Sequence, residues 1–242
     1  MENLEEYKAS LADKTPAQVI KWAEIEFAGS NVALASSMGA EDQVLTCLIK
    51  QNAPSTRIFT LDTGRQFQET YDVMQDTMDK YGIHYEVCTP DHHKVAAMVS
   101  EKGPNLFRNS IEDRKLCCNI RKVEPLKKVL GTLKAWITGL RQEQSVTRTG
   151  VDVIEWDQGN SIYKINPLWN WSEREVWDFI DEKEIPYTSL HDKGFRSIGC
   201  APCTRATNPG EDARAGRWWW ETPEQKECGL HMVNGKLERI KK

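Results

Sequence analysis

The chain has 242 residues, of which 32 are Lys or Arg, 36 are Asp or Glu, seven are Cys and nine are Trp. This length suits one α/β domain, with or without a short additional segment, and 39% apolar with 28% charged residues excludes collagen-like and wholly disordered proteins. The net charge of −4 argues against general nucleic-acid binding. No apolar run approaches the roughly 20 residues of a membrane span, and the N-terminus is acidic where a signal peptide is basic. We therefore expect a cytoplasmic protein, in a compartment that keeps thiols reduced.

The first half of the chain repeats a strand–loop–helix pattern. A helix begins at the capping box Thr15-Pro16-Ala17-Gln18 and ends at Gly29. Strands are predicted at Asn31–Ala35, Arg57–Leu61, Ile83–Cys88 and Ala135–Leu140, and helices at Val44–Asn52, Gln66–Tyr81 and Asp91–Lys102. Repeated units of this kind predict an α/β fold, with a mostly parallel sheet flanked by helices and right-handed crossovers.

The second half of the chain loses this regularity. Val151–Glu155 and Ser161–Ile165 predict a hairpin, and the sequence from Ser172 to Glu175 caps one more helix. No helical or strand period is visible after Pro186. We therefore divide the chain into a nucleotide-binding α/β domain, residues 1–190, and a C-terminal functional tail, residues 191–242. At least two of the three tryptophans at 218–220 are expected to be buried.

Two loops follow consecutive predicted strands, where parallel sheets bind ligands. Ser36-Ser37-Met38-Gly39 offers hydroxyls and a glycine before a helix N-terminus, and Asp62-Thr63-Gly64-Arg65 offers a hydroxyl, a turn glycine and a cation. Neither is a Walker loop or a GxGxxG motif. Their equivalent placement favours a nucleotide site, and ordinary turn chemistry is the alternative. Residues 100–150 also hold eleven Lys or Arg against five Asp or Glu, which suggests either a local anion site or a solvated basic helix face.

The cysteines are the most specific feature. Cys117 and Cys118 are adjacent, and Cys200 and Cys203 form a CxxC motif. Four soft thiolate ligands suit zinc or an iron–sulfur cluster, and adjacent cysteines diverge by about 100° on a helix, which a multi-iron cluster accepts more easily than one tetrahedral ion. Structural zinc and buried free thiols are the alternatives. Cys228 stands alone in a polar segment with Arg214, Arg217 and His231 nearby in sequence, which fits an exposed, activated thiolate, although a redundant surface cysteine is the commoner case.

Six motifs in order resemble the iron–sulfur branch of the assimilatory adenylylsulfate (APS) reductases, in the APS/PAPS reductase family. They are Ser36 to Asp42 (SSMGAED), Leu61 to Arg65 (LDTGR), Cys117-Cys118, Gly139 to Ser145 (GLRQEQS), Cys200 to Cys203 (CAPC) and Glu227 to His231 (ECGLH). Together they span roughly residues 30 to 232. The resemblance implies the adenine-nucleotide α-hydrolase-like fold of the ATP pyrophosphatases.

The resemblance also implies roles for individual residues. Cys228 corresponds to the nucleophile, and Cys117, Cys118, Cys200 and Cys203 to the ligands of a [4Fe-4S] cluster, with Lys122 placed between cluster and substrate. The nucleotide cradle corresponds to Ser36, Ser37, Gly39, Glu41, Asp42, Asp62, Thr63, Gly64, Arg65 and Gly139. The cations around the phosphosulfate correspond to Arg141, Arg148, Arg214, Arg217 and His231. Two positions depart from the family pattern, Met38 and Gln142, which removes one hydroxyl and weakens a paired-arginine clamp.

The reaction implied is attack by the Cys228 thiolate on the sulfur of APS, with AMP leaving. Reduced thioredoxin, or a glutaredoxin-like donor, then attacks the thiosulfonate and releases sulfite, as in assimilatory sulfate reduction for cysteine biosynthesis. A PAPS reductase or dual-specificity enzyme is the nearest alternative, an ATP pyrophosphatase-type adenylating enzyme is more remote, and a zinc-stabilised nucleotide-binding module is a third. No nucleic acid or membrane partner is expected. The oligomeric state stays open, with a homo-oligomer as one alternative, because neither a zipper nor a symmetric patch can be read.

Overall fold

The structure is a computed structural model that describes residues 3–29, 31–144 and 150–222. Its sheet has six strands in the order β3-β2-β1-β4-β6-β5. The strands are β1 Val32–Ser36, β2 Arg57–Leu61, β3 Glu86–Cys88, β4 Ala135–Ile137, β5 Ile154–Asp157 and β6 Ile162–Ile165. The helices are α1 Leu4–Leu11, α2 Pro16–Glu26, α3 Ala40–Asn52, α4 Gln68–Tyr81, α5 His92–Lys102, α6 Ile111–Cys118, α7 Glu124–Leu130 and α8 Glu173–Glu182. All neighbouring strands pair in parallel except β5 and β6, which form the predicted hairpin.

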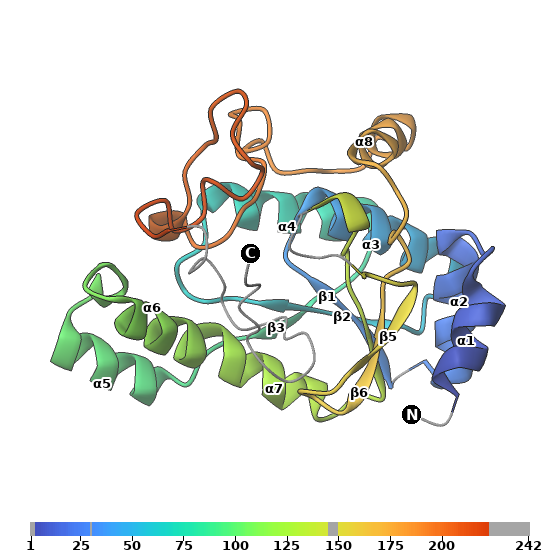
Figure 1. The fold of residues 1–242 in the computed structure, drawn as a ribbon, viewed down its shortest axis with the longest axis horizontal. Helices are drawn as coiled ribbons and strands as arrows, with labels where there is room; N and C mark the ends of the chain where they lie inside the picture. Colours follow the sequence, from blue (N-terminus) through green and yellow to red (C-terminus); the bar gives the residue numbers. More distant parts are fainter. Residues whose placement is uncertain (1–2, 30, 145–149, 223–242) are drawn as a thin grey trace.

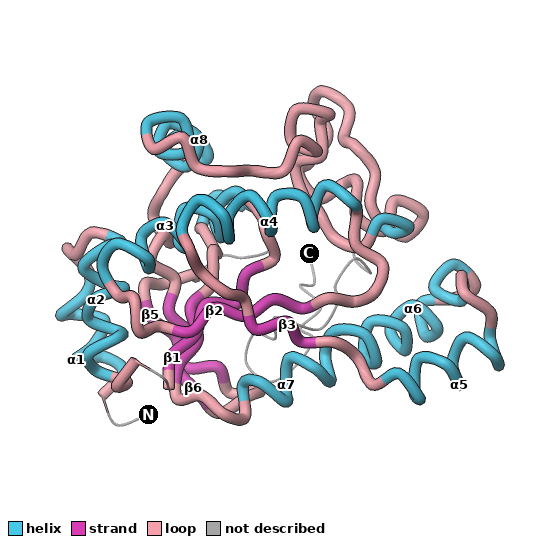
Figure 2. Tube along the Cα trace, turned by 180° about the vertical axis from the view of Figure 1, so that it is seen from behind, coloured by secondary structure: helices cyan, strands magenta, loops and turns pink. Residues whose placement is uncertain are grey.

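The central strands β1, β2 and β4 are largely buried on both faces, as parallel strands between helical layers must be, whereas the edge strand β3 is mostly exposed. Side chains alternate along β1, so that Val32 and Leu34 pack on one side with α2 and α3, and Ala33 packs on the other with α7. The same alternation separates Ile137 from Trp136 on β4. Figure 1 shows the resulting layers, with α3 and α4 above the sheet and α6 and α7 below it, and Figure 2 shows the same layers from behind. The predicted fold class is confirmed.

The predicted helix starts are confirmed at two capping boxes. The Thr15 hydroxyl accepts from the Gln18 backbone N–H while the Gln18 side chain accepts from the Thr15 N–H, and Ser172 and Glu175 repeat this arrangement at α8. Satisfying these N–H groups fixes where each helix begins. The sequence analysis did not predict α1, α6 or α7.

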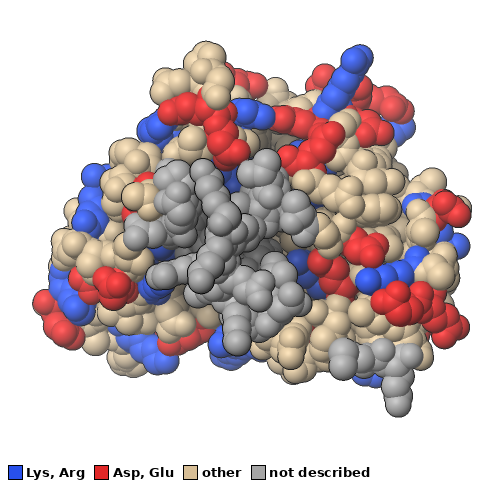
Figure 3. Space-filling model, viewed as in Figure 1, with Lys and Arg blue, Asp and Glu red and all other residues tan. Residues whose placement is uncertain are grey.

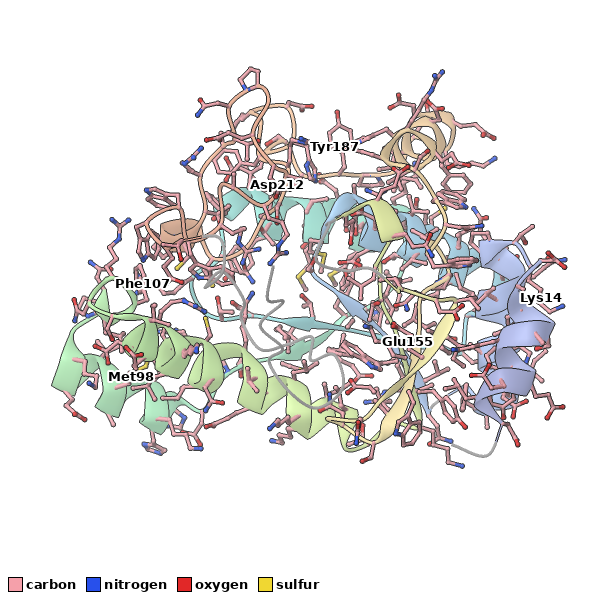
Figure 4. The ribbon with its side chains drawn as sticks, in the orientation of Figure 1. Lys14, Met98, Phe107, Glu155, Tyr187 and Asp212 are labelled. Atoms are coloured by element: carbon pink, nitrogen blue, oxygen red, sulfur yellow. The ribbon has the colours of Figure 1, made fainter. Side chains whose placement is uncertain are left out.

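A third apolar cluster lies beyond the sheet and joins α5 and α6 to the C-terminal segment, residues 191–222. Its buried members include Met98, Phe107, Ile120 and Trp218. Met98 and Phe107 lie at one end of the molecule in Figure 4, below the C-terminal segment, whereas Asp212 and Tyr187 lie above the sheet. The segment has little regular structure, with one 3-10 turn at Ala201–Cys203 and an isolated bridge between Thr204 and Arg217. It is nevertheless packed, because cysteine and tryptophan side chains supply its core.

The prediction that at least two of the tryptophans at 218–220 are buried is wrong. Trp218 is 2% exposed, but Trp219 is 36% exposed and Trp220 is only partly buried. The reason is that both outer rings pack around a surface cation, with the Arg108 guanidinium 5.2 Å from the Trp219 ring and 5.0 Å from the Trp220 ring.

The described surface carries mixed charge. On the face shown in Figure 3, acidic and basic side chains are interspersed around the visible rim. None of the helices in the described ranges combines the length and the apolar composition needed to cross a membrane.

Candidate functional site

A cleft of about 540 Å³ opens where β1, β2 and β4 end. Strand β1 is flanked by β2 on one side and β4 on the other, so the chain leaves β1 and β4 in opposite directions and the following loops diverge. Such a switch point is where open α/β sheets bind ligands. The floor of the cleft includes Ser36 and Thr138, and its opposite wall comes from α8 and the C-terminal segment, including Trp177 and Arg196.

The loop after β1 is held in shape by its own carboxylate. The Asp42 Oδ2 atom accepts hydrogen bonds from the backbone N–H and the hydroxyl of Ser37, both at 2.7 Å. Gly139 lies so close to this loop that a Cβ there would stand 2.7 Å from Asp42 Oδ1 and from the Glu41 Cβ. Only a glycine lets the end of β4 approach β1 in this way. The loop is therefore preorganised, and the Ser37 N–H already has a partner.

Burial of this carboxyl group shifts its titration. Burial raises the pKa of Asp42 to about 6, with the charge of Glu41 adding to the rise and the Ser37 hydrogen bonds opposing it. The folded protein therefore holds a proton between about pH 4 and pH 6 that the unfolded chain has released, so the free energy of unfolding falls as the pH rises through this window. The contribution is on the order of 3 kcal/mol.

We expect Asp42→Asn to remove this dependence. The stability of the variant relative to the parent should improve by on the order of 3 kcal/mol between pH 4 and pH 7, because an amide has no charge to bury. Urea unfolding at several pH values measures the difference, with Asp72→Asn on the exposed face of α4 as a control. A stability difference between the Asp42→Asn variant and the parent that does not change with pH would contradict the assignment.

Five basic side chains from three parts of the chain line the cleft: Lys122, Arg141, Arg196, Arg214 and Arg217. Arg141 is engaged, because its Nε lies 2.9 Å from the Glu41 carboxylate. Arg217 lies against Gly199, where a Cβ would stand 2.3 Å from the guanidinium, and donates to the Ile198 carbonyl. Within the described ranges no carboxylate pairs with Lys122 or Arg214. Five basic side chains against the carboxylates of Glu41, Asp42, Glu143 and Glu173 leave the lining with a small net positive charge when all are ionised.

The structure brings most of the predicted substrate residues together. The cleft is lined by Ser36, Ser37, Gly39, Glu41, Asp42, Lys122, Gly139, Arg141, Arg214 and Arg217. Arg148, Cys228 and His231 lie outside the described residues. The second predicted loop, Asp62, Thr63, Gly64 and Arg65, is not part of the lining. It borders the cysteines instead, since the Thr63 hydroxyl is 3.2 Å from the Cys200 sulfur and the Arg65 carbonyl accepts from the Ala201 N–H.

The cysteines at 117, 118, 200 and 203 gather in the third apolar cluster, where α6 ends beside the 3-10 turn. Burial raises the pKa of the Cys203 thiol to about 12, and the charges of Cys200, Cys118 and Cys117 add to the rise. The four sulfur atoms are thus close enough to act on one another. The described residues contain no group of three or more His, Cys, Asp or Glu placed to hold one metal ion.

The four cysteines lie in an apolar cluster that also has arginine side chains beside it. A π-helical turn, Asn119–Val123, follows Cys118 directly and carries Arg121, which is buried and donates to the Thr63 carbonyl at 2.6 Å. Arg121 and Arg65 both lower the pKa of Cys117, against the larger effect of burial. π-helical turns often occur at functional sites. With no cation bound, burial therefore outweighs these arginines and favours the protonated thiols, while the arginines would offset part of any negative charge held there.

Sequence reasoning missed the far wall of the cleft. Trp177, His191, Phe195 and Arg196 line it, and no motif in the sequence marks them. The His191 ring packs edge-on against Trp177 at 5.1 Å, and burial lowers its pKa, so the ring is neutral near pH 7. These residues lie at the cleft because of the path taken by α8 and the chain after it, which no sequence motif marks.

Known proteins resemble this chain along most of its length. Residues 31–206 match the phosphoadenosine phosphosulfate reductase domain family. The chain is 52% identical over 201 residues to the adenosine 5'-phosphosulfate reductase of Allochromatium vinosum, covering 83% of this chain and 78% of the relative. It is 43% identical over 228 residues to the protein of the same name from Neisseria meningitidis, covering 93% and 92%. The crystal structure of phosphoadenylyl-sulfate reductase from Candida auris, a phosphate complex, superposes with a TM-score of 0.74 at 27% identity, covering 84% of this chain and 96% of that one.

Proposed function

The chain belongs to the phosphoadenosine phosphosulfate reductase family, and from this premise we propose that it reduces adenylylsulfate to sulfite and AMP in assimilatory sulfate reduction. The observation that carries the proposal is the cleft, in which Lys122, Arg214 and Arg217 converge next to a preorganised loop at the sheet's switch point. AMP becomes a good leaving group when cations neutralise its phosphate, so these three side chains supply the stabilisation the reaction needs.

The uncharged adenosine and the charged phosphosulfate of APS need different partners in the cleft. Because the Ser37 N–H and hydroxyl already bind Asp42, the loop offers little to a phosphate and is better suited to the uncharged adenosine. We assign the adenosine to this loop and Gly139, and the phosphosulfate to the cations. The predicted cations Arg148 and His231 would join them from outside the described residues. Asp62, Thr63, Gly64 and Arg65 would act through the cysteines that they border.

The four clustered cysteines suit a [4Fe-4S] cluster as resident cofactor. Four thiolates are soft ligands that suit a multi-iron core, and the neighbouring Arg65 and Arg121 would offset part of its negative charge. Cys117, Cys118, Cys200 and Cys203 would hold it. When bound, the cluster supplies an electrostatic element beside the cleft. Lys122 lies four residues after Cys118 and lines the cleft, so it links the two regions.

Cys228 is the proposed nucleophile. Its thiolate forms a bond to the sulfur of APS while the bond from that sulfur to the phosphate oxygen breaks, and AMP leaves with the electron pair. A thiolate of reduced thioredoxin, or of a glutaredoxin-like donor, then attacks the Cys228 sulfur, and sulfite leaves with the S–S bonding pair. The second donor thiol restores Cys228 and leaves the donor as a disulfide, so two thiols are oxidised for each sulfite formed. This need for reduced thiols, together with the free cysteines of the described chain, supports a cytoplasmic location.

We expect Arg214→Ala to weaken binding of AMP and APS by about 10- to 150-fold, the effect of losing one charge-assisted hydrogen bond of about 1.5–3 kcal/mol. Calorimetric titration with AMP measures this loss. Arg205→Ala is the matched control, because Arg205 lies in the same segment but pairs with Glu211 and does not line the cleft. Equal affinity in the Arg214 variant and the parent would place Arg214 outside the phosphate site.

The proposed function is tested by sulfite release under anaerobic conditions with reduced thioredoxin, comparing kcat/KM for APS and PAPS. We expect a preference for APS of about a hundredfold or more, equivalent to about 2.7 kcal/mol. Comparable values would indicate the dual-specificity alternative, and a preference for PAPS would reverse the assignment. If neither compound yields sulfite, the adenylating alternative gains support, and release of pyrophosphate from ATP would identify it.

A further inference from the structure

Arg114 joins the helix that ends in Cys117 and Cys118 to the last described residues of the chain. Its side chain is fully buried on α6 and meets Glu221, which is 5% exposed. The guanidinium binds both carboxylate oxygens, with Nε to Oε1 at 2.8 Å and a terminal nitrogen to Oε2 at 2.9 Å. A two-point bond of this kind fixes orientation as well as distance.

The same ion pair is connected to the cleft through Trp218. The Arg114 guanidinium lies 4.7 Å from the Trp218 ring, and the Arg217 guanidinium lies 4.9 Å from it. Arg217 lines the cleft, whereas Arg114 and Glu221 do not. The Glu221 N–H also donates to the Trp218 carbonyl at 2.8 Å. Glu221 is therefore held in a fixed relation to the proposed phosphosulfate site without contacting it.

Glu221 stands seven residues before Cys228 in the sequence. Seven residues span at most roughly 25 Å, so the place where Glu221 is held limits the volume that the Cys228 thiol can reach. Fixing the start of a tether raises the effective concentration of the group it carries at a nearby site. Because Arg217, four residues before Glu221, already lines the cleft, this volume includes the cleft.

We propose that the buried Arg114–Glu221 ion pair positions the nucleophile, by fixing where Glu221, seven residues before Cys228 in the sequence, lies relative to the cleft. Both residues are positioning residues and touch neither substrate nor reacting atoms. The inference rests on the proposed function, since it takes Cys228 to attack APS.

The test measures the first chemical step alone. APS at saturating concentration is mixed with the purified, iron-loaded full chain without thioredoxin, and mass spectrometry follows the addition of one SO₃ group to Cys228. The principal variant is Arg114→Met with Glu221→Leu, because replacing both partners of a buried pair by apolar side chains usually preserves folding, whereas removing one leaves a buried charge unpaired. Glu221→Asp keeps the charge and tests partial rescue. Glu211→Gln, which breaks the more exposed pair with Arg205 in the same segment, is the control.

We expect the double variant to add the SO₃ group about tenfold more slowly or worse, with AMP affinity and iron per chain within about twofold of the parent. Glu221→Asp should recover part of the rate, and Glu211→Gln should leave it unchanged. If the double variant reacts at the rate of the parent, the inference is refuted and the proposed function still stands. A loss of AMP affinity or iron in proportion to the rate would also refute it, because the pair would then have a general structural role. If the parent itself forms no adduct, the Cys228 chemistry fails and the inference fails with it.

Discussion

Cys228→Ser will abolish sulfite formation and leave AMP binding and iron content unchanged. A serine hydroxyl is almost entirely protonated at neutral pH and is a far weaker nucleophile than a thiolate, so we expect a loss of at least about 10³-fold in kcat. Residue 228 lies outside the described residues, so the prediction depends on chemistry and on the sequence motif Glu227 to His231. Sulfite release with thioredoxin and calorimetric titration with AMP measure the two properties.

Cys88→Ser provides the matched control. Cys88 is a partly buried free thiol at the end of β3, and burial raises its pKa, so it is a thiol with low reactivity. The control variant should keep its activity within about twofold, as expected for a cysteine whose thiolate form is scarce. Sulfite formation by the Cys228→Ser variant at near the parent rate would end the assignment of Cys228 as nucleophile and direct attention to the described thiols.

Regular elements were predictable where the side-chain pattern alone decided them. The bounds of β2, Arg57–Leu61, agree with the prediction, and α2 and α8 begin at the predicted caps Thr15 and Ser172. Strand burial and capping are local properties, because they depend on residues a few positions apart. Once these strands and helices are predicted, the parallel sheet follows from one further rule, the right-handedness of strand–helix–strand crossovers.

The region between α5 and β4 was not predictable in the same way. Helices α6 and α7 are joined by a π-helical turn, and Pro125 stands at the start of α7, so the apolar residues do not keep one helical period. The C-terminal segment has no period because its core is made of cysteine and tryptophan side chains on irregular backbone. Its structure follows from contacts with α5 and α6, which sequence spacing does not encode.

The residues of the candidate site also fall into two groups, those that the sequence marks and those that only the folded chain brings together. The loop at Ser36 to Asp42 and Gly139 were predicted because they belong to motifs, whereas Arg214 and Arg217 were predicted only because the family resemblance implied them. The far wall at His191 and Arg196 was not, and neither was the pair between Arg114 and Glu221, whose partners are separated by more than a hundred residues. For the loop at Asp62 to Arg65, the place in the fold was predicted correctly but the contacts were not. Its position after β2 is as predicted, but its atoms meet the cysteines, because β2 ends further from β4 than β1 does.

Cys203→Ala in the iron-loaded protein will remove most of the iron and the absorbance near ~400 nm that thiolate-bound iron–sulfur centres show. Cys203 is 8% exposed and lies among the other three cysteines, so its replacement removes one of the four proposed ligands. We expect sulfite formation to fall by at least about 10²-fold, as losses of this size follow when metal-site shells are disturbed. Iron analysis, the visible spectrum and the sulfite assay measure the three effects.

Cys47→Ala separates loss of a ligand from loss of a buried thiol. Cys47 is 1% exposed on the buried face of α3 and does not belong to the cysteine cluster, so its replacement should lower stability slightly and leave the iron in place. The same comparison decides between the metals that the sequence left open. Zinc in the parent protein, lost in the Cys203 variant, would favour a single-ion site held by the same thiols. Iron lost from the Cys203 variant and kept by the Cys47 variant would assign these thiols to a cluster, because only ligation, and not burial, distinguishes the two positions.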